Sequence, residues 1–416
     1  MPEFLELLPP GDALDLYLER IHVQLPAEDI DSRQAHGRVA YQDIFAPHAL
    51  PAFDRGSVDG YAVRALDTHG ASDSLPAYLQ LVGEVRMGES AQVAVNSAEC
   101  CLIHTGGMLP QGSDAVVMLE NTQVAKPGEI EIYRAAAQGE NVIRTGEDIQ
   151  QGEIVIPGGK ILNAADIGGV LALGITRIQV VRKPVVGIIS TGDEIIPPEE
   201  DILPGQIRDI NSYSLAALVE SAGGRPHNYG IISDQEEPLL TTARQAVQEC
   251  DLVVITAGSS ASNRDLTAGV INKLGQPGVL VHGVNVRPGK PTILAACKPE
   301  GAQYTKPIIG LPGNPVSALV IALLFVEPVV DLLLGVKPKR LRNFIQAQVS
   351  VNLSSSSGRE DWIPVKITAQ DHQYLAEPIF GKSNLIFTLA RADGLLHIPA
   401  PATGLDSGQK AEVLLF

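Results

Sequence analysis

The 416-residue sequence contains few aromatic residues and few cysteines. Phe, Trp and Tyr make up 4% of the chain, and Trp362 is the single tryptophan. So few aromatic side chains argue against a surface that stacks the bases of single-stranded nucleic acid. The four cysteines are the adjacent Cys100 and Cys101, followed by Cys250 and Cys297. Their spacing matches neither a disulfide framework nor a zinc site.

Positive charge is also scarce. The chain has 31 Lys and Arg residues against 48 Asp and Glu residues, which gives a formal net charge of −17 at pH 7. We therefore expect neither nucleic acid nor an anionic membrane as a partner. The acidic N-terminus is interrupted by Pro9 and Pro10, and no signal peptide or membrane span is recognised. These features predict a cytoplasmic globular protein, in which an anionic ligand requires a local cationic patch.

Two common nucleotide-binding motifs are missing. No GxGxxG follows a predicted strand, and the chain has no GxxxxGK[ST]. At this length, with 45% hydrophobic residues, the sequence predicts two to four globular domains.

The order of predicted elements gives a multidomain α/β plus β fold in four parts. Residues 1–50 and 143–182 contain helical and extended segments, and we expect them to form one discontinuous N-terminal linker domain. Short strand-like runs separated by Gly and Pro predict a small β domain over 51–142. Strand and helix alternation predicts an α/β domain with a mostly parallel sheet over 183–336. Alternating runs over 337–416 predict a C-terminal domain like a β-barrel.

The α/β part is centred on a strand predicted over Lys306–Leu311, followed by the turn PGNP and a long apolar run. We expect Asn314 to cap the helix that follows and Pro315 to occupy its first turn. Glu327 and Asp331 lie within the apolar run, which predicts a buried helix and not a membrane span. The N-terminus of such a helix is suited to bind an anion.

Three polar loops follow predicted strands of the α/β part. Ser190–Glu194 offers hydroxyls for an oxyanion and carboxylates for a hard cation. Thr256–Asp265 is rich in small hydroxyl residues and ends in Arg-Asp, typical of a phosphate cradle beside a metal-binding or general-base carboxylate. The PGNP turn offers backbone donors. Ligands lie at the carboxyl ends of parallel strands. Taken alone, each loop also fits ordinary turn and helix-cap chemistry, and that alternative stays open.

A basic loop precedes the next predicted strand. Arg287 and Lys290 lie on the constrained sequence RPGKPT, which makes them the expected source of a local positive patch. The alternative is a solvated loop without a ligand. Further polar stretches over Phe53–Val63, Thr105–Val117 and Gly146–Ile149 identify no function individually.

Taken together and in this order, these segments resemble a known family. FD…DGYAV, HTGGMLPQGSDAVVM, STGDE, RPGKP and LPGNPVSA are similar to the molybdopterin molybdenumtransferases, the family of bacterial MoeA and the gephyrin E domain. ADGLLHIP near the C-terminus agrees, so the resemblance covers essentially the whole chain. It implies an elongated four-part subunit that forms a homodimer. The site is expected where the α/β domain of one subunit faces the small β domain of the other.

The resemblance also implies the chemistry. The family inserts molybdate into adenylylated molybdopterin with a divalent cation, normally Mg²⁺, and releases AMP. Further partners are expected among other cofactor-synthesis proteins. Tungstate is an alternative oxyanion, because its size and charge are nearly those of molybdate.

The resemblance is carried to individual positions as follows. Asp59, Asp148, Glu194 and Asp265 are expected to be catalytic, and Glu194 and Asp265 are also the expected metal ligands. The loops described above complete the expected substrate-binding set: Thr105, Thr191, Gly192, Asp193, Gly258, Ser260, Arg287, Lys290, Pro312, Gly313, Asn314, Pro315 and Ser317.

The chain departs from the family pattern at several positions. Ala257 and Ser262 replace glycines, Arg55 replaces a short amide, and Pro364 lies where an Arg is common. These changes indicate a divergent branch or a second copy. A non-catalytic carrier of molybdopterin is therefore the alternative function, and a structural scaffold is a third. The retained carboxylates favour an enzyme.

Overall fold

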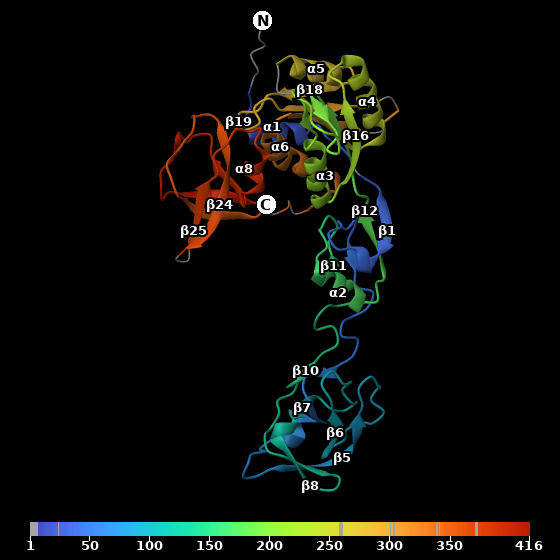
Figure 1. Cartoon of the computed structure of the whole chain (residues 1–416). Coiled ribbons are helices and arrows are strands. Elements are labelled where there is room, and N and C mark those ends of the chain that lie inside the picture. The colour runs from blue at the N-terminus through green and yellow to red at the C-terminus, as the bar shows by residue number, and fades with distance from the viewer. Residues whose placement is uncertain are drawn as a thin grey trace.

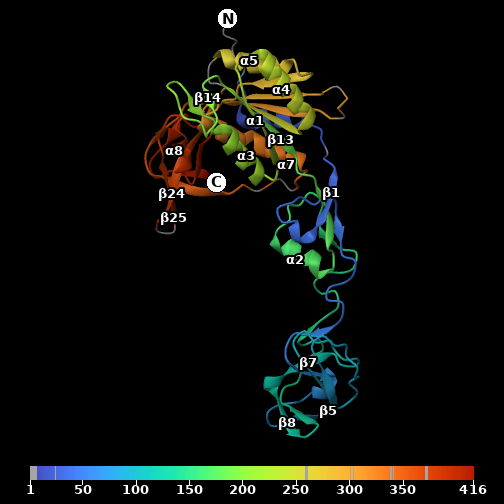
Figure 2. The same ribbon diagram turned by 45° about the vertical axis from the view of Figure 1, so that its right-hand side comes forward.

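The structure is a computed structural model that describes residues 7–23, 25–257, 261–299, 301–302, 304–337, 340, 342–370 and 373–416, with backbone alone at 261–264. The molecule is elongated (Figures 1 and 2). An α/β body and a β-barrel lie side by side at one end, a small β body lies at the other, and a narrow linker joins them. This arrangement confirms the expected fold class, while the exact domain boundaries given above stay a prediction.

The small β body contains a six-stranded sheet in the order β7-β4-β6-β5-β9-β8. The strand-like runs that the sequence shows at Tyr61–Val63, Leu79–Val82 and Ala115–Leu119 fall on β4, β5 and β7, so these three predicted strands are confirmed. The strands are β4 (Gly60–Val63), β5 (Ala77–Val85), β6 (Glu99–Ile103), β7 (Ala115–Met118), β8 (Thr122–Lys126) and β9 (Glu129–Ile132). Gly60 of the DGYAV motif is required by this packing. A Cβ atom there would lie 2.0 Å from the carbonyl oxygen of Val117 on β7.

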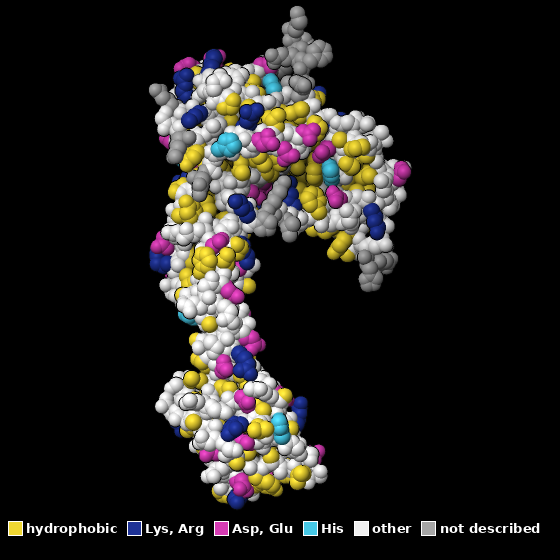
Figure 3. Space-filling view, turned by 180° about the vertical axis from the view of Figure 1, so that it is seen from behind, with side chains coloured by type: hydrophobic (Ala, Val, Ile, Leu, Met, Phe, Trp, Pro, Cys, Tyr) yellow, Lys and Arg dark blue, Asp and Glu magenta, His cyan; other side chains and the backbone are white. Residues whose placement is uncertain are grey.

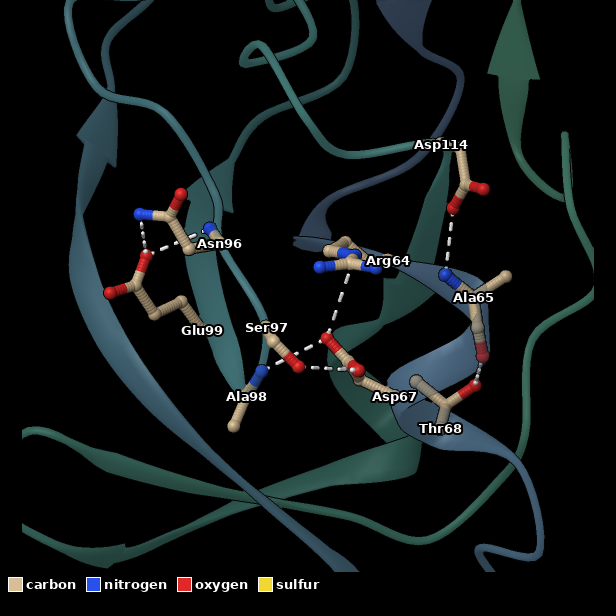
Figure 4. Close-up of polar contacts among 9 residues, drawn as sticks. All are labelled: Arg64, Ala65, Asp67, Thr68, Asn96, Ser97, Ala98, Glu99 and Asp114. Atoms are coloured by element: carbon tan, nitrogen blue, oxygen red, sulfur yellow. Dashed lines mark hydrogen bonds and ion pairs between the residues drawn. The ribbon is translucent and has the colours of Figure 1, made fainter.

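Carboxylates stabilise the turns of this body (Figure 4). Asp67 accepts hydrogen bonds from the amide of Ala98 at 2.9 Å and from the hydroxyl of Ser97 at 3.2 Å. Asp114, from the GSDAVV segment, accepts the amide of Ala65 at 2.7 Å. These acidic residues therefore have structural partners within the small β body.

The linker is made of two chain segments that pair with each other. Its elements are β1 (Ala27–Asp31), η1 (Ser32–Gln34), β2 (Ile44–Phe45), β3 (Arg55–Gly56), β10 (Val142–Ile143), β11 (Ile154–Ile156), α2 (Ala164–Ala172) and β12 (Arg177–Val181). β1 pairs with β12, β2 with β11 and β3 with β10, all antiparallel. The first helix, α1 (Pro10–Leu18), packs on the α/β body instead. There the buried Tyr17 hydroxyl donates to the carbonyl of Ile308 at 2.9 Å.

The α/β body contains the sheet β16-β13-β17-β21-β20-β18. β16, β13, β17 and β21 are parallel, so the predicted mostly parallel sheet is confirmed. β20 and β18 continue it in antiparallel pairings that the sequence analysis did not identify. The elements are β13 (Val185–Thr191), α3 (Asn211–Ser221), β16 (Arg225–Ile232), α4 (Glu236–Glu249), β17 (Leu252–Ala257), α5 (Ala261–Asn272), β18 (Pro277–His282), β20 (Ile293–Cys297) and β21 (Lys306–Pro312).

The predicted long helix follows β21 directly. It consists of α6 (Pro315–Ile321), a π-helical turn, η4 (Ala322–Val326), and α7 (Glu327–Leu333). By length and hydropathy this run could cross a membrane, but 67% of its most apolar window is buried within the protein, as expected for a core helix. Pro315 occupies the first turn as predicted. Asn314 stands at the N-cap position, but its side chain forms no capping hydrogen bond among the described residues.

The C-terminal strands close into a barrel, as predicted. β22 (Phe344–Val349), β24 (Glu360–Gln370), β25 (Gln373–Pro378), β26 (Gly394–Ile398) and β28 (Lys410–Leu415) pair in the order β24-β25-β22-β28-β26, and β24 also pairs with β26. A short strand of the basic loop, β19 (Val286–Arg287), adds to β24. Trp362, Leu395 and Leu414 of the barrel share one buried core with the long helix. The barrel is therefore packed firmly against the α/β body.

Candidate functional site

The three predicted loops of the α/β body leave the same edge of the sheet. β17 lies between β13 and β21, with Ser190 paired to Thr256 and Ala257 paired to Pro312. Since all three strands are parallel, their carboxyl ends are neighbours. The three loops therefore begin side by side at this edge of the sheet. Gly258 and Ser260 lie outside the described residues.

The two carboxylates of the loop after β13 differ in their surroundings. Asp193 accepts the amide of Asp234 at 3.2 Å, which fastens this loop to the loop after β16. Glu194 is exposed, and a Cβ atom on Gly192 would lie 3.0 Å from its Oε2 atom. The nearest atoms to such a Cβ belong to Ile195, at 2.8 Å, so glycine lets the loop turn closely after the buried Thr191.

The second expected metal ligand, Asp265, is an exposed side chain in the second turn of α5. No group of three His, Cys, Asp or Glu residues suited to a metal ion occurs within the described ranges. Mg²⁺ commonly uses one or two carboxylates together with phosphates of its substrate. Glu194, on the loop after β13, and Asp265, on α5, are both exposed carboxylates, which is the donor type that such a site uses.

The PGNP turn is held by a residue that the sequence analysis missed. Asn211, at the start of α3, donates from Nδ2 to the carbonyl of Gly313 at 2.8 Å, and only 7% of this residue is exposed. Asp209, just before the N-cap residue of the same helix, accepts the amide of Ser212 in the first turn at 3.1 Å. Asp209, two residues before the start of the helix at Asn211, was the available signal. The turn is therefore fixed from α3 as well as from β21.

A cavity of about 960 Å³ lies between the α/β body and the barrel. It collects five residues of the expected substrate-binding set: Arg287, Lys290, Pro312, Asn314 and Ser317. The barrel supplies an opposite wall that the sequence analysis did not identify, which includes Arg359, Asp361, Trp362, Lys382 and Ser383. Pro364, noted above as a departure from the family pattern, also lines this wall, and the sequence GKSN over Gly381–Asn384 was a further hint that was not recognised.

The cavity carries an excess of positive charge. The buried carboxylate of Asp361 pairs with Arg359 through contacts of 2.7 and 3.1 Å and lies 3.9 Å from a guanidinium nitrogen of Arg287. Lys290 and Lys382 are exposed and form no ion pair with any residue that the structure describes. On the face shown in Figure 3, by contrast, Lys and Arg side chains are dispersed among acidic ones. The cavity is therefore suited to an anion.

Glycine at position 289 brings the basic loop close to the long helix. Its φ is 119°, and a Cβ atom there would lie 2.4 Å from side-chain atoms of Ile321. A larger residue would push Arg287 and Lys290 away from the core and from Ser317. The glycine of RPGKP thus places the two cations at the cavity.

Asp59 and Thr105 form a second group of expected site residues. The Asp59 Oδ1 atom accepts the Thr105 amide at 2.7 Å and its hydroxyl at 3.1 Å. The amide hydrogen bond, followed by the hydroxyl, holds the pKa of Asp59 below its ordinary value. Both side chains are exposed. The carboxylate is therefore ionised, oriented and open to a ligand.

One chain does not bring all expected site residues together. The sheet that holds Asp59 and Thr105 lies at the opposite end of the molecule from β13, β17 and β21 (Figures 1 and 2). Asp148 lies next to the linker strands, where its amide donates to the carbonyl of Leu50 at 3.1 Å and its side chain is exposed.

Fold and site together define a class: a multidomain protein with a cationic cavity, suited to an anionic ligand, at the carboxyl edge of an α/β sheet. Comparison with known proteins gives the family. Three protein families match successive parts of the chain. The MoeA N-terminal region (domain I and II) matches residues 8–174. The probable molybdopterin binding domain matches residues 187–331, and the MoeA C-terminal region (domain IV) matches residues 346–416. The chain belongs to the MoeA family, the molybdopterin molybdenumtransferases, so the expected family and enzyme class are confirmed.

Individual relatives agree over nearly full length. The chain is 34% identical to a putative molybdopterin biosynthesis protein of Methanocaldococcus jannaschii, covering 99% of this chain and 98% of the relative. It is 31% identical to the molybdopterin molybdenumtransferase of Nostoc, covering 95% and 90%. A crystal structure of a molybdopterin biosynthesis MoeA protein from Pyrococcus horikoshii superposes with a TM-score of 0.85 at 32% identity, covering 99% and 100%.

Proposed function

We propose that this enzyme inserts molybdate into the dithiolene of adenylylated molybdopterin and releases AMP in a Mg²⁺-dependent reaction. The observation that carries the proposal is the cationic cavity between the α/β body and the barrel. It is lined by RPGKP and PGNP residues, and its volume suits a ligand of this size.

The side chains of this protein would bind and orient the anionic substrates. Lys290 and Lys382 offset the charge of an oxyanion or phosphate, and the PGNP turn offers backbone donors. Mg²⁺, held by Glu194 and Asp265, would neutralise phosphate charge when bound. Asp265 and Asp59 are the carboxylates that would orient the attacking water or take up its proton.

The distance between the two groups of site residues supports a shared site. Because Asp59 and Thr105 lie far from the cavity of their own chain, we propose that they complete the cavity of a second subunit in a homodimer. A cytoplasmic location and further cofactor-synthesis partners stay predictions.

A carrier of molybdopterin is the alternative function, and turnover distinguishes the two. The purified protein is incubated with adenylylated molybdopterin, Mg²⁺ and molybdate, and AMP is measured over time. An enzyme releases many equivalents of AMP, whereas a carrier releases none or a single equivalent. A parallel reaction with tungstate determines the preferred oxyanion.

A lysine pair offers a matched test of the cavity. We expect Lys382→Met to lower AMP release by about tenfold or more, because one unpaired cation facing the ligand is lost. Lys366→Met is the control, since Lys366 is an exposed lysine of the same barrel that does not line the cavity. Equal rates for Lys382→Met and the wild type would show that the anion binds elsewhere.

A further inference from the structure

A histidine that the proposed function does not use lies beside Asp59. His104 directly follows β6, and its Nε2 atom is 2.9 Å from Oε1 of Glu84. Its other ring nitrogen, Nδ1, is 3.9 Å from Oδ1 of Asp59. The imidazole therefore lies between two carboxylates, with one ring nitrogen facing each.

The strand register produces this arrangement. β4 and β6 are antiparallel with Gly60 opposite Ile103, so Asp59 and His104 are the next residues along the pair. β5 and β6 are parallel with Glu84 opposite Leu102, two residues before His104 and on the same face of the sheet. Three neighbouring strands thus place Glu84, His104 and Asp59 in a row.

The hydrogen bond to Glu84 orients the ring. An ionised carboxylate only accepts hydrogen bonds. Nε2 of His104 therefore carries a hydrogen and donates a hydrogen bond to Glu84. Nδ1 is thereby turned toward Asp59. With Nδ1 unprotonated, its lone pair faces the carboxylate. With Nδ1 protonated, a cation stands between the two carboxylates and offsets their charge.

The net charge of this row of side chains affects how well an anionic substrate can bind beside it. Glu84, His104 and Asp59 have side chains that are 44%, 38% and 57% exposed, so a ligand can reach the row. Two carboxylates repel phosphate, and the imidazolium reduces that repulsion. Among the described residues, only Thr105 donates hydrogen bonds to the Asp59 carboxylate. The ring of His104 is the adjacent group that adds a cationic contact when Nδ1 is protonated.

We propose that His104, oriented by Glu84, is a positioning residue that sets the charge and orientation of Asp59 in the molybdenum-inserting site. This inference rests on the proposed function for its catalytic consequence. The coupling between His104 and Asp59 can be measured without any substrate.

The first experiment follows the Thr105 amide proton by NMR in the deuterated full-length protein between pH 5 and 8. Histidine changes charge in this range, and the Thr105 amide reports on the carboxylate it binds. We expect a step in its chemical shift in the wild type and in His69→Gln, a change at an exposed histidine of the same β body. The step should be absent in His104→Gln. A wild-type protein without a step, or a step that persists in His104→Gln, overturns the inference.

The second experiment measures AMP release as a function of pH. The Gln amide in His104→Gln can replace Nε2 toward Glu84 but leaves nothing at the Nδ1 position. We expect its kcat to fall by about tenfold, the scale of a lost outer partner, with a flattened profile between pH 5 and 8. Glu84→Gln should give a smaller decrease, and His69→Gln none. Wild-type rate and profile in His104→Gln overturn the positioning role.

The two experiments test the coupling of His104 to Asp59 separately from the proposed function. If the wild-type protein shows the NMR step but releases no AMP, the proposed function is overturned, and the coupling of His104 to Asp59 is supported. If His104→Gln does not fold, the wild-type titration alone still decides whether Asp59 senses a charge change.

Discussion

Hydrogen bonds from neighbouring backbone amides orient individual carboxylates in this protein and lower their pKa. Asp54 accepts the amide of Thr145 at 2.7 Å and its hydroxyl at 2.8 Å, which joins the two chain segments beside the β3–β10 pair. The amide hydrogen bond is the main cause that lowers the pKa of Asp54. Residues like Asp54 and Asp59 therefore bind best in their ionised form.

The Asp54 contact predicts a pH-dependent stability. A folded-state pKa below the unfolded value means that the contact contributes stability above about pH 4 and loses it as the pH falls through the folded-state pKa. We expect Asp54→Asn to lower the unfolding midpoint at pH 7, with the difference from wild type shrinking below pH 4. Thermal unfolding followed by circular dichroism from pH 7 to pH 2.5 measures this. A difference that is constant with pH would contradict the role of the charge.

At the scale of elements, close strand packing makes one motif glycine irreplaceable. We expect Gly60→Ala to destabilise the small β body by about 1–3 kcal/mol or more, because the added methyl group overlaps the Val117 carbonyl on β7. Gly168→Ala is the control. Gly168 is exposed on α2 with no atom within 4 Å of an added Cβ, so alanine should stabilise by about 0.5–1 kcal/mol. Urea unfolding, together with hydrogen exchange of the β4 and β7 amides, compares the stability of the two variants with that of the wild type. Equal stability of Gly60→Ala and wild type would disprove the packing argument.

At the scale of the whole molecule, the elongated shape predicts a site built by two chains. Sedimentation should give twice the 44.1 kDa chain mass. Asp59→Ala and Asp265→Ala should each be inactive as homodimers. A mixed dimer then holds one site with both changes and one with neither, and should recover about half of the wild-type activity if the two sites act independently. Differently tagged chains allow its purification. A folded mixed dimer as inactive as its parents would place both residues in one chain's site.

Local patterns were sufficient to predict much of this protein from its sequence. The alternation of strands and helices, the buried long helix and the position of three polar loops directly after strands depend on residues close together in the chain. The motifs DGYAV, STGDE, RPGKP and LPGNPVSA indicated the family for the same reason. Turns, strand ends and the glycines that permit them leave a recognisable order of residues.

Other features were decided only by tertiary structure. The docking of α1 through Tyr17, the closure of β24 on β26 and the barrel wall with Lys382 all join residues far apart in sequence. The antiparallel direction of β18 and β20 was likewise visible only in the folded sheet. The same holds for Glu84, His104 and Asp59, which three strands align. Such contacts depend on pairing register and on the burial of shared apolar surface, and one stretch of sequence encodes neither by itself.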